Sequence, residues 1–318
     1  MTSVVFVHGL GNKPAATELL RIWQRALGRD NGIDLGAAGI DCSMVYWADV
    51  FYPSPDPDIA KYESTDDLAL SKEQEASATD SEVRVKDQLS SGERKFLDGL
   101  AKKYDVNIAY TAASNDVANS DKDAVDVYER IPLPGFLKER VMARFVQEAY
   151  AYIFDKESSP LEAKKYKVRA ELRERFISTL KNIKAAKPNE PIVVISHSMG
   201  TMIAYDCMKC VPDCPNVDWL LTIGSPLGID EIQDGFASVW TRENGYPYEK
   251  LTQGWINIYD PLDVVARLDP NLANDYQRAG SPVIRDIAES NWGAWRHSIS
   301  KYFQGKQLRS ALRQALGI

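Results

Sequence analysis

The stretch Ile192 to Gly200, "IVVISHSMG", decides the fold of this chain. Its first four residues are β-branched and aliphatic, which is typical of a strand buried on both faces of a parallel sheet. The run stops abruptly at Ser-His-Ser-Met-Gly, and the helical pattern "TMIAYDCM" follows at once. Because ligands gather at the carboxyl ends of parallel strands, we expect the chemistry of the protein at this junction.

The junction fits a nucleophile elbow, a strained strand-to-helix turn with the pattern small-x-Ser-x-Gly. Strand and helix nearly collide in such a turn, so the residues two before and two after the serine must be small. Ser196 and Gly200 meet this requirement around Ser198. We therefore expect Ser198 to be the nucleophile and Ser196 a spacer. The alternative is an ordinary turn in which a serine caps the helix.

Strand-like and helical segments alternate along the rest of the chain, which predicts an α/β fold with a mostly parallel central sheet and helices on both faces. Short apolar runs predict strands at residues 3–8, 42–52, 191–198, 217–228, 254–263 and 282–290. Apolar residues at helical spacing predict helices at residues 14–28, 135–155, 161–186, 199–209 and 297–316.

The acidic residues are concentrated in one part of the chain. The net charge is −7, and residues 54–130 hold 18 acids and 10 bases, against 27 and 28 in the remainder. An excess confined to one segment predicts an insertion. We therefore divide the chain into an α/β core, residues 1–52 and 160–318, and an acidic, mostly helical insertion, residues 53–159. The insertion could cap the site, or bind a protein partner through residues 54–130.

Composition excludes several classes of function. The acidic balance argues against a nucleic-acid partner. No apolar run reaches the roughly 18 residues that a membrane span needs, and no leader precedes the first strand, so we expect a cytoplasmic protein. Residues 129–145 could form a membrane-surface helix, but we favour a core-facing helix with a basic outer face.

Neither a metal nor a cofactor is expected. Cys207, Cys210 and Cys214 have metal-like spacing, but no fourth ligand lies near them in sequence. The glycines of "HGLGNKP", residues 8–14, fail the dinucleotide fingerprint because Pro14 stands where a glycine is required.

A serine hydroxyl is a poor nucleophile until a base takes its proton. The chain has three histidines, at positions 8, 197 and 297. His197 adjoins Ser198 on the elbow, where neighbouring side chains point apart, and a loop-bracing role fits His8 better. Elimination leaves His297 as the base. Its place late in the chain agrees with the order Ser…Asp…His that accompanies a nucleophile elbow.

The base needs a carboxylate to orient it, and "GWINIYDPLDVVARLDP" offers Asp260, Asp263 and Asp269. We favour Asp263 over Asp260 because the orienting acid normally lies on the loop beyond the strand. Two backbone N–H groups should stabilise the oxyanion. One belongs to Met199, after the nucleophile, and our candidate for the other is Leu10 in the loop "HGLG".

With these pieces the chain resembles the α/β-hydrolase superfamily, of the lipase and esterase type. The matching stretches come in the family's order: "HGLG", "SHSMG", "GSPLG", "WINIYDPLDVVA" and "RHSIS". The resemblance implies a compact sheet of about six strands and a cofactor-free site in which Ser198, Asp263 and His297 form a triad. Two departures are serine at position 196 and an insertion after the second strand, whereas family lids more often follow the strand after the nucleophile helix.

The expected function is a serine hydrolase that cleaves a carboxylic ester of a small acyl substrate through an acyl-enzyme. The same triad would serve a thioesterase, an amidase or a peptidase. A different class is a non-catalytic interaction protein on a hydrolase scaffold. Residues 226–253, which include Phe236 and Trp240, are a candidate wall of an acyl pocket.

Overall fold

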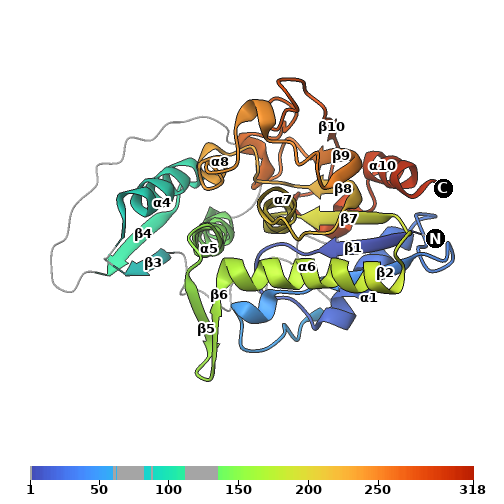
Figure 1. Cartoon of the computed structure of the whole chain (residues 1–318). Coiled ribbons are helices and arrows are strands. Elements are labelled where there is room, and N and C mark those ends of the chain that lie inside the picture. Colours follow the sequence, from blue (N-terminus) through green and yellow to red (C-terminus); the bar gives the residue numbers. More distant parts are fainter. Residues whose placement is uncertain (1, 60–61, 63–81, 87–88, 112–134) are drawn as a thin grey trace.

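The structure is a computed structural model that describes residues 2–59, 62, 82–86, 89–111 and 135–318 (Figure 1). Its centre is a six-stranded sheet in which every neighbouring pair of strands is parallel, so the predicted α/β fold is confirmed. The strand order is β10-β9-β8-β7-β1-β2. The bounds are β1 Ser3–Val7, β2 Asp41–Val45, β7 Ile192–His197, β8 Val217–Ile223, β9 Leu251–Tyr259 and β10 Arg285–Ala288.

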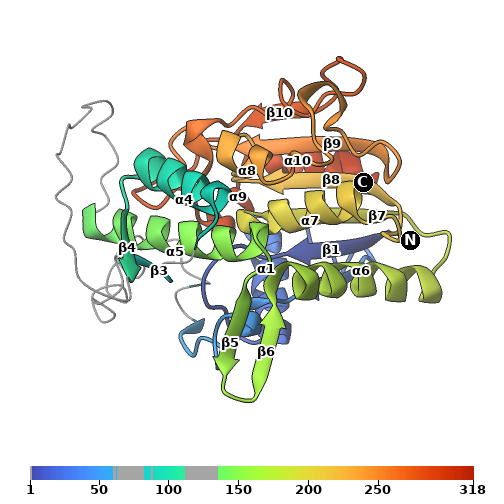
Figure 2. The ribbon, with the colours of Figure 1, turned by 60° about the vertical axis from the view of Figure 1, so that its left-hand side comes forward.

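Helices cover both faces of the sheet, and the alternation of side chains along each strand assigns them (Figure 2). On one face, Val4 and Phe6 of β1 pack in a cluster with α1 (Ala16–Gly28), α9 (Ile299–Tyr302) and α10 (Lys306–Leu316). On the other face, Val5 and Val7 pack in a cluster with α6 (Val168–Ala186) and α7 (Met199–Cys210). This burial of both faces explains the continuous apolar runs in the sequence.

The register of the central strands brings two loops together. β7 lies between β1 and β8, with Ser196 beside Val7 and His197 beside Ile223. The loop after β1 and the turn after β7 therefore leave the sheet side by side at its carboxyl edge, where the polar residues of the sequence were expected to meet.

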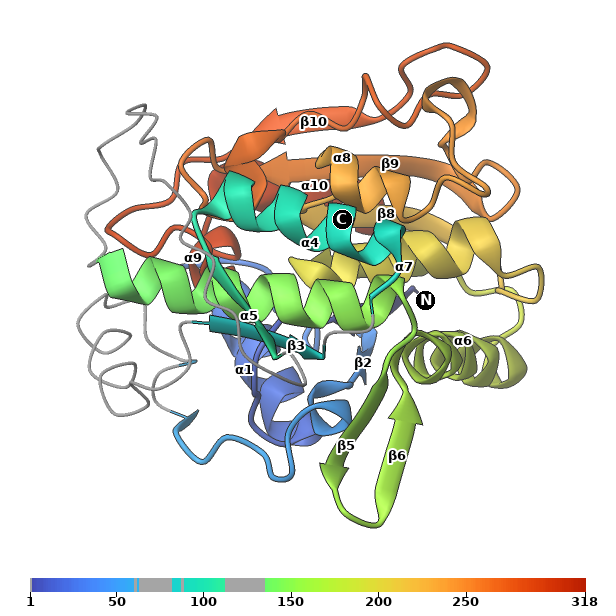
Figure 3. The same cartoon turned by 90° about the vertical axis from the view of Figure 1, so that its left-hand side faces the viewer.

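The described part of the insertion lies at that same edge. It contains β3 (Glu82–Lys86), α4 (Ser91–Tyr104), β4 (Asn107–Thr111) and α5 (Gly135–Ile153), and β3 pairs with β4. Figure 3 looks onto this end of the molecule, with α4 and α5 lying across it. Met142, Phe145 and Val146 of α5 are buried in the same cluster as α6 and α7. Within the described ranges, no helix is both long and apolar enough to cross a membrane.

Two predicted helices were drawn too long. Instead of a helix from residue 161, the chain forms an antiparallel hairpin of β5 (Glu157–Leu161) and β6 (Lys164–Lys167), and α6 begins only at Val168. The predicted C-terminal helix divides into α9 and α10. Glu289 caps the start of α10, since its carboxylate accepts the amides of Gln307 and Leu308, and a Cβ at Gly305 would lie 2.2 Å from one of its oxygens.

The strand predicted at residues 42–52 also ends early, at Val45. Trp47 leaves the sheet because its backbone N–H donates to His8 Nε2 at 2.9 Å and its indole stacks on the imidazole, with ring centroids 4.5 Å apart. A 3-10 helix, η1 (Ala48–Val50), follows. Other short elements of the chain are α8 (Asp230–Asp234), η2 (Arg242–Asn244) and η3 (Ala266–Leu268).

Candidate active site

The turn between β7 and α7 is sharp and strained. Ser198 has φ 55° and ψ −130°, in a region that residues other than glycine rarely adopt. Its amide donates to Ile223 O at 2.9 Å, and its carbonyl accepts the Thr201 hydroxyl at 2.7 Å. A Cβ at Gly200 would lie 2.5 Å from His8 O. The backbone of β1 therefore leaves no room for a side chain there, which is the physical reason for the small residue in the pattern.

His297 and Asp263 are joined by a two-pronged hydrogen bond. His297 Nδ1 donates to the two carboxylate oxygens of Asp263 at 2.7 and 2.8 Å. The carboxylate also accepts the Val265 amide at 2.8 Å, the Ala266 amide at 3.3 Å and the Tyr302 hydroxyl at 2.8 Å. Burial alone would raise the pKa of Asp263, but His297 and these donors outweigh it and lower the pKa. A buried, ionised carboxylate thus faces the imidazole.

The other candidate acid points elsewhere. Asp260 accepts the Asn291 amide at 2.6 Å and faces the Arg296 guanidinium at 3.3 Å. The structure therefore brings Asp263, and not Asp260, to His297.

Ser198 and His297 line one cavity of about 500 Å³. Ser198 Oγ and His297 Nε2 are both buried, and neither atom makes a hydrogen bond within the described part of the chain. The hydroxyl and the ring nitrogen are thus not bonded to each other. Hydrogen bonds between catalytic groups often tighten only when substrate binds.

The two remaining histidines support the loops of the site. His197 Nε2 donates to His297 O at 3.0 Å, and the two rings lie 4.6 Å apart, so His197 holds the segment that carries the candidate base. His8 accepts from Trp47 and stacks on its ring. Burial lowers the pKa of both His8 and His197 well below the usual value, so both rings are neutral. The support that His197 gives to His297 was not anticipated from sequence.

The loop after β1 is pressed against the elbow. A Cβ at Gly9 would lie 2.7 Å from Ser198 Cβ. Gly11 N donates to Glu148 at 3.1 and 3.2 Å, while the Lys13 ammonium donates to Leu10 O and, at 3.1 Å, to Gly11 O. Among the described residues, no protein acceptor takes the N–H of Leu10 or Met199, the two expected oxyanion donors.

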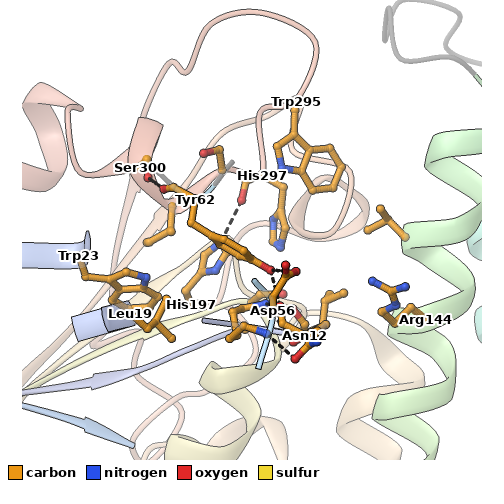
Figure 4. A pocket seen from close by; sticks show the side chains of 18 of the residues that line it. Asn12, Leu19, Trp23, Asp56, Tyr62, Arg144, His197, Trp295, His297 and Ser300 are labelled. Carbon is orange, nitrogen blue, oxygen red and sulfur yellow. Dashed lines mark hydrogen bonds between the residues drawn. The ribbon is translucent and has the colours of Figure 1, made fainter. Parts of the chain in front are cut away.

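The cavity wall differs from the expected one. Residues 226–253 do not line it, and Phe236 is instead fully buried against Tyr205. Figure 4 shows the cavity between α1 and α5. Its apolar lining comprises Leu10, Leu19, Trp23, Val141, Trp295 and Ile299. In the described ranges, no group of three or more His, Cys, Asp or Glu side chains could hold a metal ion.

No family model and no curated protein matches this chain. Three solved structures that it resembles share little sequence. An esterase from Pyrococcus furiosus is 14% identical over 45% of this chain and 62% of the esterase, with a TM-score of 0.31. A prolyl endopeptidase is 12% identical over 47% and 26%, with a TM-score of 0.29. An uncharacterized protein from Pseudomonas aeruginosa is 9% identical over 91% and 40%, with a TM-score of 0.30.

This chain therefore spans less than two thirds of each of these three proteins. Two of the three are hydrolases by description, but at such identities and scores the likeness says nothing about activity. The structural class of the protein follows from its own sheet, which is that of an α/β fold with a cavity at the carboxyl edge.

Proposed function

We propose that this protein is a serine hydrolase that cleaves carboxylic esters, with Ser198 as nucleophile, His297 as base and Asp263 as the acid that orients the base. One observation carries the proposal. His297 Nδ1 donates its proton to the buried Asp263 carboxylate, so in the neutral ring the free lone pair is on Nε2. Nε2 has no hydrogen-bond partner among the described residues, and His297 lines the same cavity as Ser198.

The first half of the reaction forms an acyl-enzyme. Ser198 Oγ bonds to the acyl carbon of the substrate while its proton moves to His297 Nε2, and the ionised Asp263 stabilises the resulting imidazolium. The C–O bond to the leaving group then breaks, and the leaving alcohol takes the proton from Nε2. In the second half, His297 takes a proton from water, the hydroxide oxygen bonds to the acyl carbon, and Ser198 leaves with the proton.

The developing oxyanion is assigned to the backbone N–H groups of Leu10 and Met199. Met199 is the first residue of α7, so its N–H is one of those that a helix leaves without an internal partner. A preorganised donor of this kind contributes about 3–4 kcal/mol to transition-state stabilisation. Gly9 supports this assignment, because only a glycine lets the Leu10 segment approach Ser198 so closely.

The test is covalent labelling with a fluorophosphonate probe, combined with turnover of p-nitrophenyl esters. Ser198→Ala should abolish both signals. Ser196→Ala is the matched control, because the Ser196 hydroxyl donates to Leu221 O at 3.2 Å, away from the proposed reaction, and this variant should keep both signals. Folded wild-type protein that is neither labelled nor active would refute the proposal, as would labelling that survives Ser198→Ala.

Substrate chemistry within this class is a separate measurement. Matched ester, thioester and anilide substrates present the same acyl carbon with different leaving groups, and all are open to the same nucleophile. We expect the ester to give the highest kcat/KM. A higher value for the thioester or the anilide would assign the protein to thioesterases or to amidases and peptidases instead.

A further inference from the structure

The cavity around Ser198 differs in charge from the chain as a whole. The chain carries a net charge of −7. Among the described residues that line the cavity, however, the cations are Lys13, Arg140 and Arg144, and the only acidic side chain is Asp56. A cleft with one sign of charge and apolar walls concentrates ligands of the opposite sign.

The acidic groups near the cavity are bound to protein donors. Asp56 accepts the Tyr62 hydroxyl at 3.0 Å. Glu148 lies behind the cavity wall and accepts the Gly11 amide and the Tyr52 hydroxyl, the latter at 2.6 Å. Burial raises the pKa of Glu148, while the Tyr52 hydroxyl, Arg144, the Gly11 amide and Lys13 act in the opposite direction. Three cations thus stand against one acid in the described lining and Glu148 behind it, so positive groups are in the majority among these residues.

Arg144 is placed to meet a ligand next to the reacting atoms. Figure 4 shows its side chain reaching from α5 toward the cavity, on the side opposite Trp23. Its guanidinium lies 6.0 Å from the ring centroid of Tyr52, and one of its nitrogens is 3.4 Å from where a Cβ at Gly11 would be. The guanidinium is thus adjacent to the loop that carries the proposed oxyanion donor.

Lys13 contributes a fixed charge. Its ammonium donates to the carbonyls of Leu10, Gly11 and Asn12, so its position is determined by the loop. Lys13 is also one of the groups that lower the pKa of His197, after the larger effects of burial and of His297.

Apolar side chains lie across the cavity from Arg144. Figure 4 shows Leu19 and Trp23 of α1 on that side, and Arg140, one helical turn before Arg144 on α5, also lines the cavity. A ligand that fills this cavity therefore needs a hydrocarbon part for one wall and an anionic part for the other. A guanidinium suits carboxylates and phosphates because it can donate two parallel hydrogen bonds.

We propose that the substrates of this hydrolase are acyl compounds that carry a carboxylate or a phosphate, and that Arg144, together with Arg140, binds this anionic group. The inference rests on the proposed function and specifies its substrate class. Arg144 acts here as a specificity-determining residue, whose interaction adds binding energy for one kind of substrate.

The experiment measures a selectivity ratio, the kcat/KM of an anionic ester divided by that of a neutral ester of matched length. One pair is the p-nitrophenyl monoester of glutaric acid against p-nitrophenyl pentanoate, which tests a carboxylate on the acyl part. The other pair is 4-acetoxyphenyl phosphate against phenyl acetate, which tests a phosphate on the leaving group. We expect a ratio on the order of tenfold in at least one pair, falling as ionic strength rises.

Variants then assign the ratio to its residue. Arg144→Gln should lower it about tenfold through KM, and Arg144→Lys should keep part of it, since the charge remains while the paired donors are lost. Arg140→Gln provides a second test on the same wall if the first variant fails to fold. Lys165→Gln is the matched control, because Lys165 lies exposed on the β5–β6 hairpin and faces Glu157.

Two results would overturn the inference: ratios of one or less in both pairs for the wild type, or a ratio that neither arginine variant changes. Failure of the proposed function looks different. If turnover of the neutral esters does not depend on Ser198, the hydrolase assignment itself is wrong. If turnover depends on Ser198 but shows no preference for anions, only the substrate class is wrong.

Discussion

Replacing Asp263 with asparagine tests the proposed relay at the point where the structure is most constrained. Each carboxylate oxygen of Asp263 accepts from His297 and from a second donor, Val265 N on one side and the Tyr302 hydroxyl on the other. An asparagine can offer only one acceptor oxygen. In either orientation of the amide, its NH₂ group faces the Val265 N–H or the Tyr302 hydroxyl, which are themselves donors. The NH₂ group can also donate to His297 Nδ1, which then loses its proton to Nε2.

With the proton on Nε2, His297 can no longer take the proton of Ser198. In the well-studied Ser-His-Asp enzymes, the same asparagine substitution lowers kcat about 10⁴-fold, and we expect a loss of about 10³–10⁴-fold here. That loss corresponds to about 4–5.5 kcal/mol of transition-state stabilisation. The unfolding free energy should also fall, by about 1–3 kcal/mol, because hydrogen bonds to a charged group are lost.

The assay measures kcat for hydrolysis of one ester, and circular dichroism checks that each variant is folded. Asp260→Asn is the matched control, because Asp260 bonds Asn291 and Arg296 instead of the imidazole, and its loss of activity should stay below about tenfold. The difference in unfolding free energy between wild type and Asp263→Asn should be largest at neutral pH. It should shrink as the pH falls below about 4, because the depressed pKa of Asp263 makes its contribution present above that pH. An Asp263→Asn variant that stays within tenfold of the wild type, or an Asp260→Asn variant that loses as much activity, would refute the reasoning.

Two further predictions concern stability. Gly200→Ala would place a methyl group 2.5 Å from His8 O and 2.6 Å from Val7 O, so it should lower the unfolding free energy by about 1–3 kcal/mol. Gly92→Ala is the control. Its Cβ would meet nothing within 4 Å, so this variant should be as stable as the wild type or more stable. Urea unfolding measures both free energies. A Gly200→Ala variant as stable as Gly92→Ala would show that the elbow has room for a side chain. Burial raises the pKa of Glu93, but its ion pair and hydrogen bonds outweigh this and hold it at about 2. Glu93→Gln should therefore cost about 1 kcal/mol at neutral pH, and the difference should vanish as the pH falls from about 4.5 toward 2; an equal cost at both ends of that range would contradict the assignment.

The sheet was predictable because its signals are local. Four β-branched residues in β7 and the similar run in β1 could only be buried strands, and each was followed by a segment with helical periodicity. The errors in the predicted helices arose where local composition does not determine the structure. Lysine-rich residues 161–167 have a composition that suits a helix, yet they turn back as a hairpin. The start of α10 is capped by Glu289, which precedes it by a whole loop and cannot be recognised as a cap from sequence.

The candidate site divides in the same way. The candidates came from local signals: Ser198 from the motif around it, His297 by elimination among three histidines, and Asp263 from its position on the loop after a strand. The supporting contacts did not follow. Glu148 reaches Gly11 across 137 positions of sequence, and Tyr302 reaches Asp263 across 39. Neither residue belongs to a short pattern, so only the packed structure could reveal them.

These supporting contacts bear on why the insertion follows β2. The peptide group between Leu10 and Gly11 is planar and trans, so its C=O and N–H point in opposite directions. Lys13 holds the C=O, and Glu148 of α5 holds the N–H, so the plane of this peptide is fixed from both sides. Because the N–H of Leu10 belongs to the preceding peptide, its direction depends on this anchored plane. If Leu10 supplies the oxyanion donor, then α5 positions part of the catalytic machinery, and the helix that carries Arg144 into the cavity also sets the geometry of the reaction.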